Sequence, residues 1–98
     1  MKSQKYHFGK DTPETEKLIA FTHGRFKPQP HPQMTYVGED YLKSTFYHIQ
    51  SGATVSINTP WTCVASGVSE GVIEIFAEEK ATRQNAKSVL EQFLGFKF

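Results

Sequence analysis

The sequence predicts an α+β domain. We expect an antiparallel sheet of four to five strands, a C-terminal amphipathic helix packed on one face, and a short N-terminal helix. Three observations predict this class. Residues 53–58 alternate apolar and polar side chains, as in a strand that buries one face. Glycine turns separate this run from other β-rich segments. Residues 79–94 repeat their apolar side chains at helical spacing.

The N-terminal region is expected to contain an extended piece and then a helix. Residues 1–10 include Tyr-His-Phe before a glycine, and we expect them to form an N-terminal arm. Thr12 is a suitable N-cap, Pro13 suits the first helical position, and Gly24 marks the end of the helix. The segment Leu-Ile-Ala-Phe-Thr at 18–22 also fits a strand, but the start signal favours the helix.

Residues 25–33 are expected to connect this helix to the sheet. They contain three alternating prolines, which lack a backbone donor and push the preceding residue toward extended geometry. The connector should therefore resemble a polyproline II segment. A short strand follows at 34–37, and residues 45–50 and 53–58 are expected to form a hairpin across a Ser-Gly turn.

Two further strands are expected before the final helix. Pro60 interrupts the pairing after the hairpin, since proline cannot donate to a central ladder. Residues 61–65 are then expected to form a strand. A turn with glycine at both ends spans 66–71, and residues 72–77 return as a largely buried strand.

The C-terminal helix has the clearest pattern. Its apolar side chains form one continuous stripe: Ala86, Val89, Leu90, Phe93 and Leu94. We expect this stripe to pack on the sheet face that bears Val55, Ile57, Ile73 and Ile75. Gly95 lies where a left-handed C-cap is expected, and Phe96 is placed to fold back on the last turn. Phe98 is expected to insert between strands of its own sheet or into a neighbouring copy.

The composition indicates a single soluble domain. The chain has 98 residues, of which 38% are hydrophobic and 21% charged, and a formal net charge of +1. The near-neutral charge argues against strong nonspecific binding to nucleic acid, which requires a basic face. No apolar run is long enough to span a membrane, and no signal-peptide pattern follows Met1. We therefore expect a single domain over residues 1–98, no membrane partner and a cytoplasmic location.

The residue types that carry chemistry form no catalytic or metal-binding pattern. Cys63 is the single cysteine, which excludes an internal disulfide and a multi-cysteine metal site. The four histidines are 16, 8 and 17 residues apart, unlike common ligand sets. We predict no catalytic residue, no metal site and no cofactor. A small cupin-like β-rich enzyme is the third alternative, with His48 as the histidine that precedes Cys63.

One short motif resembles part of a known signature. The sequence Gly-Arg-Phe-Lys-Pro at 24–28, followed by His31, is similar to the segment that precedes an H-x-G-H pair in nucleotidyltransferases. Such enzymes contain a parallel sheet with several crossovers. Residues 32–34 are Pro-Gln-Met, where the glycine and the second histidine would stand. We do not assign the chain to this family.

We expect a non-catalytic protein that acts through protein–protein contact, either as an oligomeric structural component or as a small inhibitor or adaptor. The small size and the lack of a cofactor motif suit a phage or mobile-element accessory protein. Aromatic and arginine side chains concentrate binding energy at interfaces. The predicted partner-binding residues are Arg25, Phe26, Lys27, Phe96 and Phe98. The expected partner is another protein, a second copy of the chain, or both.

Single-stranded nucleic acid is the alternative partner. Bases stack on aromatic side chains, and a basic groove follows the phosphates. Such a site would use the rings of Phe46, Tyr47 and Trp61 beside Arg25 and Lys27. The near-neutral net charge makes this alternative less favoured than protein contact.

Overall fold

The protein folds as an α+β domain with a five-stranded antiparallel sheet, as the sequence predicts. The computed structural model describes residues 2–9, 11–40, 44–59 and 71–98. The strand order across the sheet is β1-β5-β4-β3-β2. The elements in chain order are β1 (Ser3–Phe8), α1 (Pro13–Thr22), β2 (Met34–Glu39), β3 (Thr45–Ile49), β4 (Thr54–Asn58), β5 (Gly71–Phe76) and α3 (Lys80–Leu94).

The helix α1 forms where the start signal predicts it, and the strand alternative for 18–22 is wrong. The side chain of Thr12 accepts a hydrogen bond from the backbone N–H of Thr15 (3.2 Å), which satisfies one of the donors at the helix start. Leu18 is fully buried. Gly24, with φ of 76°, follows the C-cap residue and ends the segment in the left-handed region that glycine tolerates.

The N-terminal segment is a strand of the sheet, which corrects the expectation of an arm. β1 pairs antiparallel with β5 over its whole length, from Ser3 opposite Phe76 to Phe8 opposite Gly71. The side chains of β1 alternate between a covered face and an exposed face: Phe8 is buried, whereas Lys5 is exposed. The short Tyr-His-Phe run is therefore part of an edge strand rather than a separate arm.

The central strands pair in the register that the alternation predicts. β3 and β4 form the expected hairpin, with Tyr47 opposite Val55, and Val55 is in turn opposite Ile75 of β5. The strand expected at 61–65 and most of the turn expected at 66–71 lie outside the described residues. β2 pairs with β3 and carries a bulge between Tyr36 and Gly38, which shifts the register by one residue.

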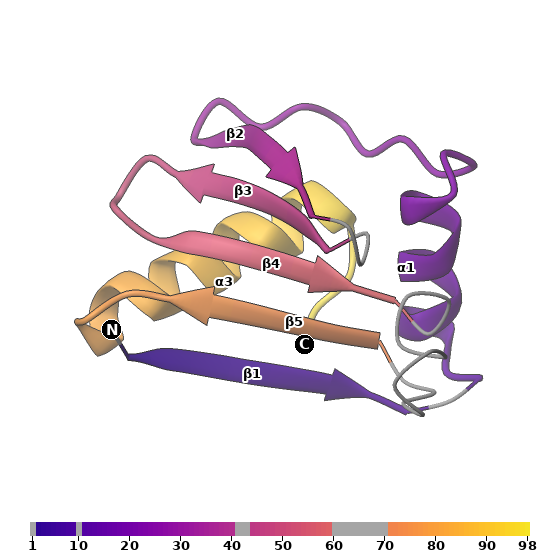
Figure 1. The fold of residues 1–98 in the computed structure, drawn as a ribbon, viewed down its shortest axis with the longest axis horizontal. Helices are drawn as coiled ribbons and strands as arrows, with labels where there is room; N and C mark the ends of the chain where they lie inside the picture. The colour runs from indigo at the N-terminus through magenta and orange to yellow at the C-terminus, as the bar shows by residue number, and fades with distance from the viewer. Residues whose placement is uncertain (1, 10, 41–43, 60–70) are drawn as a thin grey trace.

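The core lies between the sheet and the helices, on one face of the sheet. Figure 1 shows α3 running behind the sheet and α1 standing across the ends of the strands. The predicted stripe on α3 is confirmed: Leu90, together with Ala86, Val89 and Leu94, is buried, and Phe93 is partly buried against the core. The facing strand residues Val55, Ile57, Ile73 and Ile75 have no exposed surface. Burying each such side chain contributes roughly 1.5–3 kcal/mol.

The connector at 25–33 contains neither helix nor strand and runs from α1 back to β2 (Figure 1). It lies against the end of α3. Nε2 of His31 donates a hydrogen bond to Oε1 of Gln92 (2.7 Å), and Pro28 lines a shallow hollow together with Gln92 and Leu94. The connector therefore belongs to the helix layer, and it is not paired with β2 as a sixth strand.

Candidate functional site

β2 forms one edge of the sheet, and part of its backbone points away from the other strands. The N–H of Gln50, at the end of β3, donates to the carbonyl of Gln33 (2.8 Å), so the backbone of Gln33 faces β3. In an antiparallel pair, this direction alternates from one residue to the next. The backbone groups of Met34 and Tyr36 therefore point outward, to the side of β2 where a further strand would pair.

Two large apolar side chains lie exposed on this same edge. Tyr36 is 58% exposed and Val37 is 63% exposed, and among the described residues they are the only exposed large hydrophobic side chains. Single exposed apolar residues are common on protein surfaces. Two in succession on an edge strand are less common, because such an edge invites pairing with another chain.

Packing beneath the ring holds Tyr36 in place. It contacts Tyr47 edge-on, with ring centroids 5.8 Å apart, and Tyr47 is in turn packed on Phe21 (6.2 Å) and Phe93 (5.5 Å). Burial raises the pKa of the Tyr47 hydroxyl to about 12, and repulsion from the Tyr36 hydroxyl adds to this rise. Tyr36 is therefore the exposed end of an aromatic group that continues into the core, so little side-chain entropy would be lost on binding.

The two ends of β2 differ in charge. Its C-terminal end carries the carboxylates of Glu39 and Asp40, and the Asp40 Oδ1 accepts a hydrogen bond from the N–H of Ser44 (3.0 Å). Its N-terminal end follows His31 and Gln33, and Nδ1 of His31 accepts from the N–H of Gln33 (3.1 Å). The edge thus has an acidic end and an end with no carboxylate, which gives it a direction.

The predicted binding residues on the connector lie elsewhere. Arg25 and Lys27 are exposed, and Phe26 is partly buried against the core. The ammonium group of Lys17 lies 4.9 Å from the centroid of the Phe26 ring and 5.7 Å from that of Phe96, within the range of cation–π contacts. The structure therefore brings Phe26 and Phe96 together through Lys17, in a contact that joins α1, the connector and the C-terminal tail.

The predicted binding residues in the C-terminal tail pack on their own sheet. Phe96 lies 6.0 Å from Phe8, and Phe98 lies 5.0 Å from Tyr6 and 5.6 Å from Phe8, all edge-on. Both tail rings are partly buried against the core. Phe98 thus packs on its own domain, but it lies on the rings of β1 rather than between strands of the sheet as expected. These two phenylalanines cover strand β1, and they leave less of their surface for a partner than Tyr36 does.

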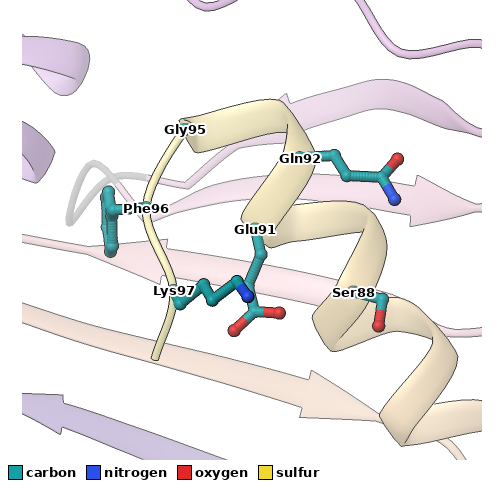
Figure 2. A pocket seen from close by; sticks show the side chains of 6 residues that line it. All are labelled: Ser88, Glu91, Gln92, Gly95, Phe96 and Lys97. Atoms are coloured by element: carbon teal, nitrogen blue, oxygen red, sulfur yellow. The ribbon is translucent and has the colours of Figure 1, made fainter.

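A shallow hollow of about 500 Å³ lies between the tail and α3. Figure 2 shows Lys97 extending from the tail toward Glu91, while Phe96 points to the other side of the tail. The hollow is lined by Ser88, Glu91, Gln92, Gly95, Phe96 and Lys97. It is open to solvent and contains groups of both charges. In the described part of the chain, no buried polar side-chain atom lacks a hydrogen-bond partner, so nothing there marks a ligand position.

The residues considered for chemistry do not gather at one place. His48 is exposed on β3, and Cys63, its expected neighbour in the enzyme alternative, lies outside the described residues. Within the ranges that the structure describes, no three histidine, cysteine, aspartate or glutamate side chains lie close enough together to hold a metal ion. Neither described helix combines the length and apolar content that crossing a bilayer requires.

The aromatic platform considered for nucleic acid is divided between two faces. Phe46 and Tyr47 are consecutive on β3, so their side chains point to opposite faces of the sheet. Tyr47 lies in the core beneath the helices, and Phe46 lies on the other face, which the helices leave uncovered. The third member, Trp61, lies outside the described residues.

No protein-family model, curated protein or solved structure matches this chain.

Sequence reasoning did not select Tyr36 and Val37. The segment at 34–37 was identified as a strand, but its place at the edge depends on the order of strands in the sheet, which the sequence pattern leaves open. One signal was present. Pro32 lies two residues before β2, and proline is tolerated near edge strands, where no neighbour requires its missing N–H.

Proposed function

We propose that this chain is a non-catalytic binding protein that holds another polypeptide by adding one of its strands to β2. The observation that carries this proposal is the pair of exposed apolar side chains, Tyr36 and Val37, on an edge with outward-facing backbone groups. Strand addition obtains affinity from backbone hydrogen bonds and specificity from alternate side chains. Both components are present on β2.

The alternative surface around the tail supports binding less well. Phe26, Phe96 and Phe98 are already packed within the domain, and contacts that stabilise the fold are not gained again on association. Arg25 and Lys27 remain exposed and are suited to a rim, where charges affect the association rate more than the affinity. The proposal therefore moves the binding surface from these predicted residues to β2.

A photo-crosslinking side chain tests the proposal. Benzoylphenylalanine replaces Tyr36 on β2 or, as a matched control, the exposed Lys5 on the opposite edge strand β1. In the cell that makes the protein, we expect a covalent adduct with a polypeptide from position 36 and none from position 5. With the purified partner, amide hydrogen exchange at 34–39 should slow while exchange at 3–8 stays unchanged.

Two outcomes would contradict the proposal. One is the absence of a position-36 adduct under conditions in which the protein is abundant and folded. The other is an adduct from that position with nucleic acid alone, which would make the nucleic-acid alternative the better explanation.

A further inference from the structure

We propose that the strand received by β2 is β2 of a second copy, so that two sheets join edge to edge around a two-fold axis that passes through Thr35. This inference rests on the proposed use of the β2 edge and names its occupant. Cyclic two-fold dimers are the most common protein assemblies, and their interface must be complementary to itself.

The backbone is self-complementary about Thr35. A two-fold axis at this residue sets Met34 of one copy opposite Tyr36 of the other, and these are the residues whose backbone groups point outward. The N–H of Tyr36 then donates to the carbonyl of Met34 across the interface, and symmetry repeats this bond. The N–H of Met34 already donates to His31 within its turn (3.1 Å), so it contributes no further bond.

The side chains match in the same register. Met34 and Tyr36 lie on the helix-covered face, because they are opposite Ile49 and Tyr47 of β3. In the pair, the exposed Tyr36 ring of one copy comes beside Met34 of the other, and thioether–aromatic contacts of this kind are favourable. On the uncovered face Thr35 meets Thr35, a cross-strand pair that is also favourable.

The charges favour an antiparallel pair over a parallel one. About the Thr35 axis, the acidic end of one β2 lies against the N-terminal end of the other, where the chain turns before Met34 and carries no carboxylate. The two Glu39 Cα atoms are then more than about 20 Å apart, at roughly 3.3 Å per residue along a strand that the bulge shortens. In a parallel pair, the carboxylates of Glu39 and Asp40 would lie beside their own copies, about 4.8 Å away, and like charges at that distance repel.

The connector leaves room for the second strand. Its contacts with Gln92 and Leu94 keep it in the helix layer rather than in the plane of the sheet. The exposure of Tyr36 and Val37 shows that the connector leaves the middle of β2 uncovered. Because only a short stretch of each edge is joined, the interface is smaller than a standard one, and the dimer should form reversibly with concentration.

Charge substitutions at the axis test the register. The mass of the parent protein, measured by analytical ultracentrifugation, should rise from 11.1 kDa at low concentration toward twice that value. Thr35→Lys places two lysines against each other and should weaken self-association about five- to tenfold, as should Thr35→Glu. An equal mixture of the two variants should associate again. His48→Lys, on the same face of the next strand, is the matched control and should associate like the parent.

A cysteine at the axis provides an independent test. Directly opposite Cα atoms lie about 4.5 Å apart in such a pair, which a disulfide can span. In a Cys63→Ser background, Thr35→Cys should form a disulfide-linked dimer on mild oxidation, and Lys5→Cys on the other edge should not.

Either of two results would overturn the self-pairing. One is a mass of 11.1 kDa at all accessible concentrations without a disulfide from position 35. The other is self-association that persists in Thr35→Lys as in the parent. In both cases, a position-36 adduct with a different polypeptide would still support strand addition to β2, whereas the absence of any such adduct would remove the proposed function as well.

Discussion

The two edge strands of the sheet, β1 and β2, are covered to different extents by the rest of the chain. On β1, the helix-covered side is closed by the C-terminal tail, where Phe98 packs on Tyr6 and Phe8. The other side of β1 presents Lys5 to solvent. On β2, no described segment covers the aromatic side chain of Tyr36 in this way, and the neighbouring exposed side chain is Val37.

The difference shows how one chain protects one edge and leaves the other available. Charged residues and covering segments are common means of preventing edge strands from pairing with other chains. Around β1, a charged residue and a covering segment occur together. The ammonium of Lys87 lies 5.3 Å from the Tyr6 ring and 5.8 Å from the Phe98 ring. The N–H of Phe98 donates a hydrogen bond to Glu91 (2.9 Å), which holds the tail in place. β2 has acidic residues at one end and a bulge at Val37, but two large apolar side chains in its middle, Tyr36 and Val37, are exposed.

The largest effect is expected from a residue on which both edges depend. Leu90 of α3 is fully buried beneath the sheet. Leu90→Ala should lower the free energy of unfolding by about 2–5 kcal/mol, because the lost contacts leave a cavity. Urea denaturation measures the loss. Hydrogen exchange should show that the amides of β1 and β2 lose protection together, since both edges share this support.

Ser88→Ala on the exposed side of α3 is the matched control and should change stability by less than about 0.5 kcal/mol. A loss at Leu90 as small as this, or a loss of protection confined to one edge, would show that the helix does not support both edges equally.

Much of the fold could be predicted because its signals are local. The alternation at 53–58 and the helical stripe ending at Leu94 are periodic patterns among residues close in sequence. The N-cap at Thr12 likewise depends only on the residues next to it. Residues 1–10 were misinterpreted as an arm because β1 pairs with β5, more than sixty residues away in the chain. Such a pairing depends on the whole topology.

The candidate site was less predictable for the same reason. The sequence predicts both a place on the domain and a partner-binding role for Phe96 and Phe98, and it does not indicate that β1 is the surface on which they pack. Tyr36 was not distinguished from other strand residues, since its exposure follows from the position of β2 at the edge. Whether an aromatic side chain is buried depends on its neighbours in space, and the sequence alone does not show which residues these are.

Alkaline pH should reveal a second difference between the edges. The pKa of Tyr47, beneath the β2 edge, is raised to about 12, so the unfolded chain loses this proton first, at a pH near 10. Ionisation then favours the unfolded state, and stability falls as the pH rises from about 10 to 12, by about 1–2 kcal/mol once solvent screening is included. Tyr47→Phe should remove most of this loss. Denaturation at several pH values measures it.

Tyr6, near the β1 edge, is the matched comparison. Burial raises its pKa as well, the guanidinium of Arg83 lowers it, and the carboxylate of Glu91 raises it. Because Tyr6 is only partly buried whereas Tyr47 is buried, Tyr6→Phe should remove a smaller part of the alkaline loss than Tyr47→Phe. An equal or larger effect at Tyr6 would mean that burial of the Tyr47 hydroxyl is not the main cause of the alkaline loss.

The smallest effects are expected at the surfaces of the edges themselves. Deleting Lys97 and Phe98 removes the ring that covers Tyr6 and Phe8, and, since Phe98 is only partly buried, the cost should be about 1–2 kcal/mol. For a domain of this size, the melting temperature should fall by roughly 5–10 °C. Hydrogen exchange should become faster at β1 and stay unchanged at β2.

Tyr36→Ala is the corresponding change on the other edge, measured at low protein concentration so that the proposed pairing of two copies does not contribute. The ring is more than half exposed and loses one edge-on contact with Tyr47, so we expect a loss of less than about 1 kcal/mol. If the tail serves to cover β1, the deletion must cost more than Tyr36→Ala. A deletion variant with the melting temperature of the parent would mean that Phe98 contributes nothing to β1. The two edges would then differ only in the side chains that they expose.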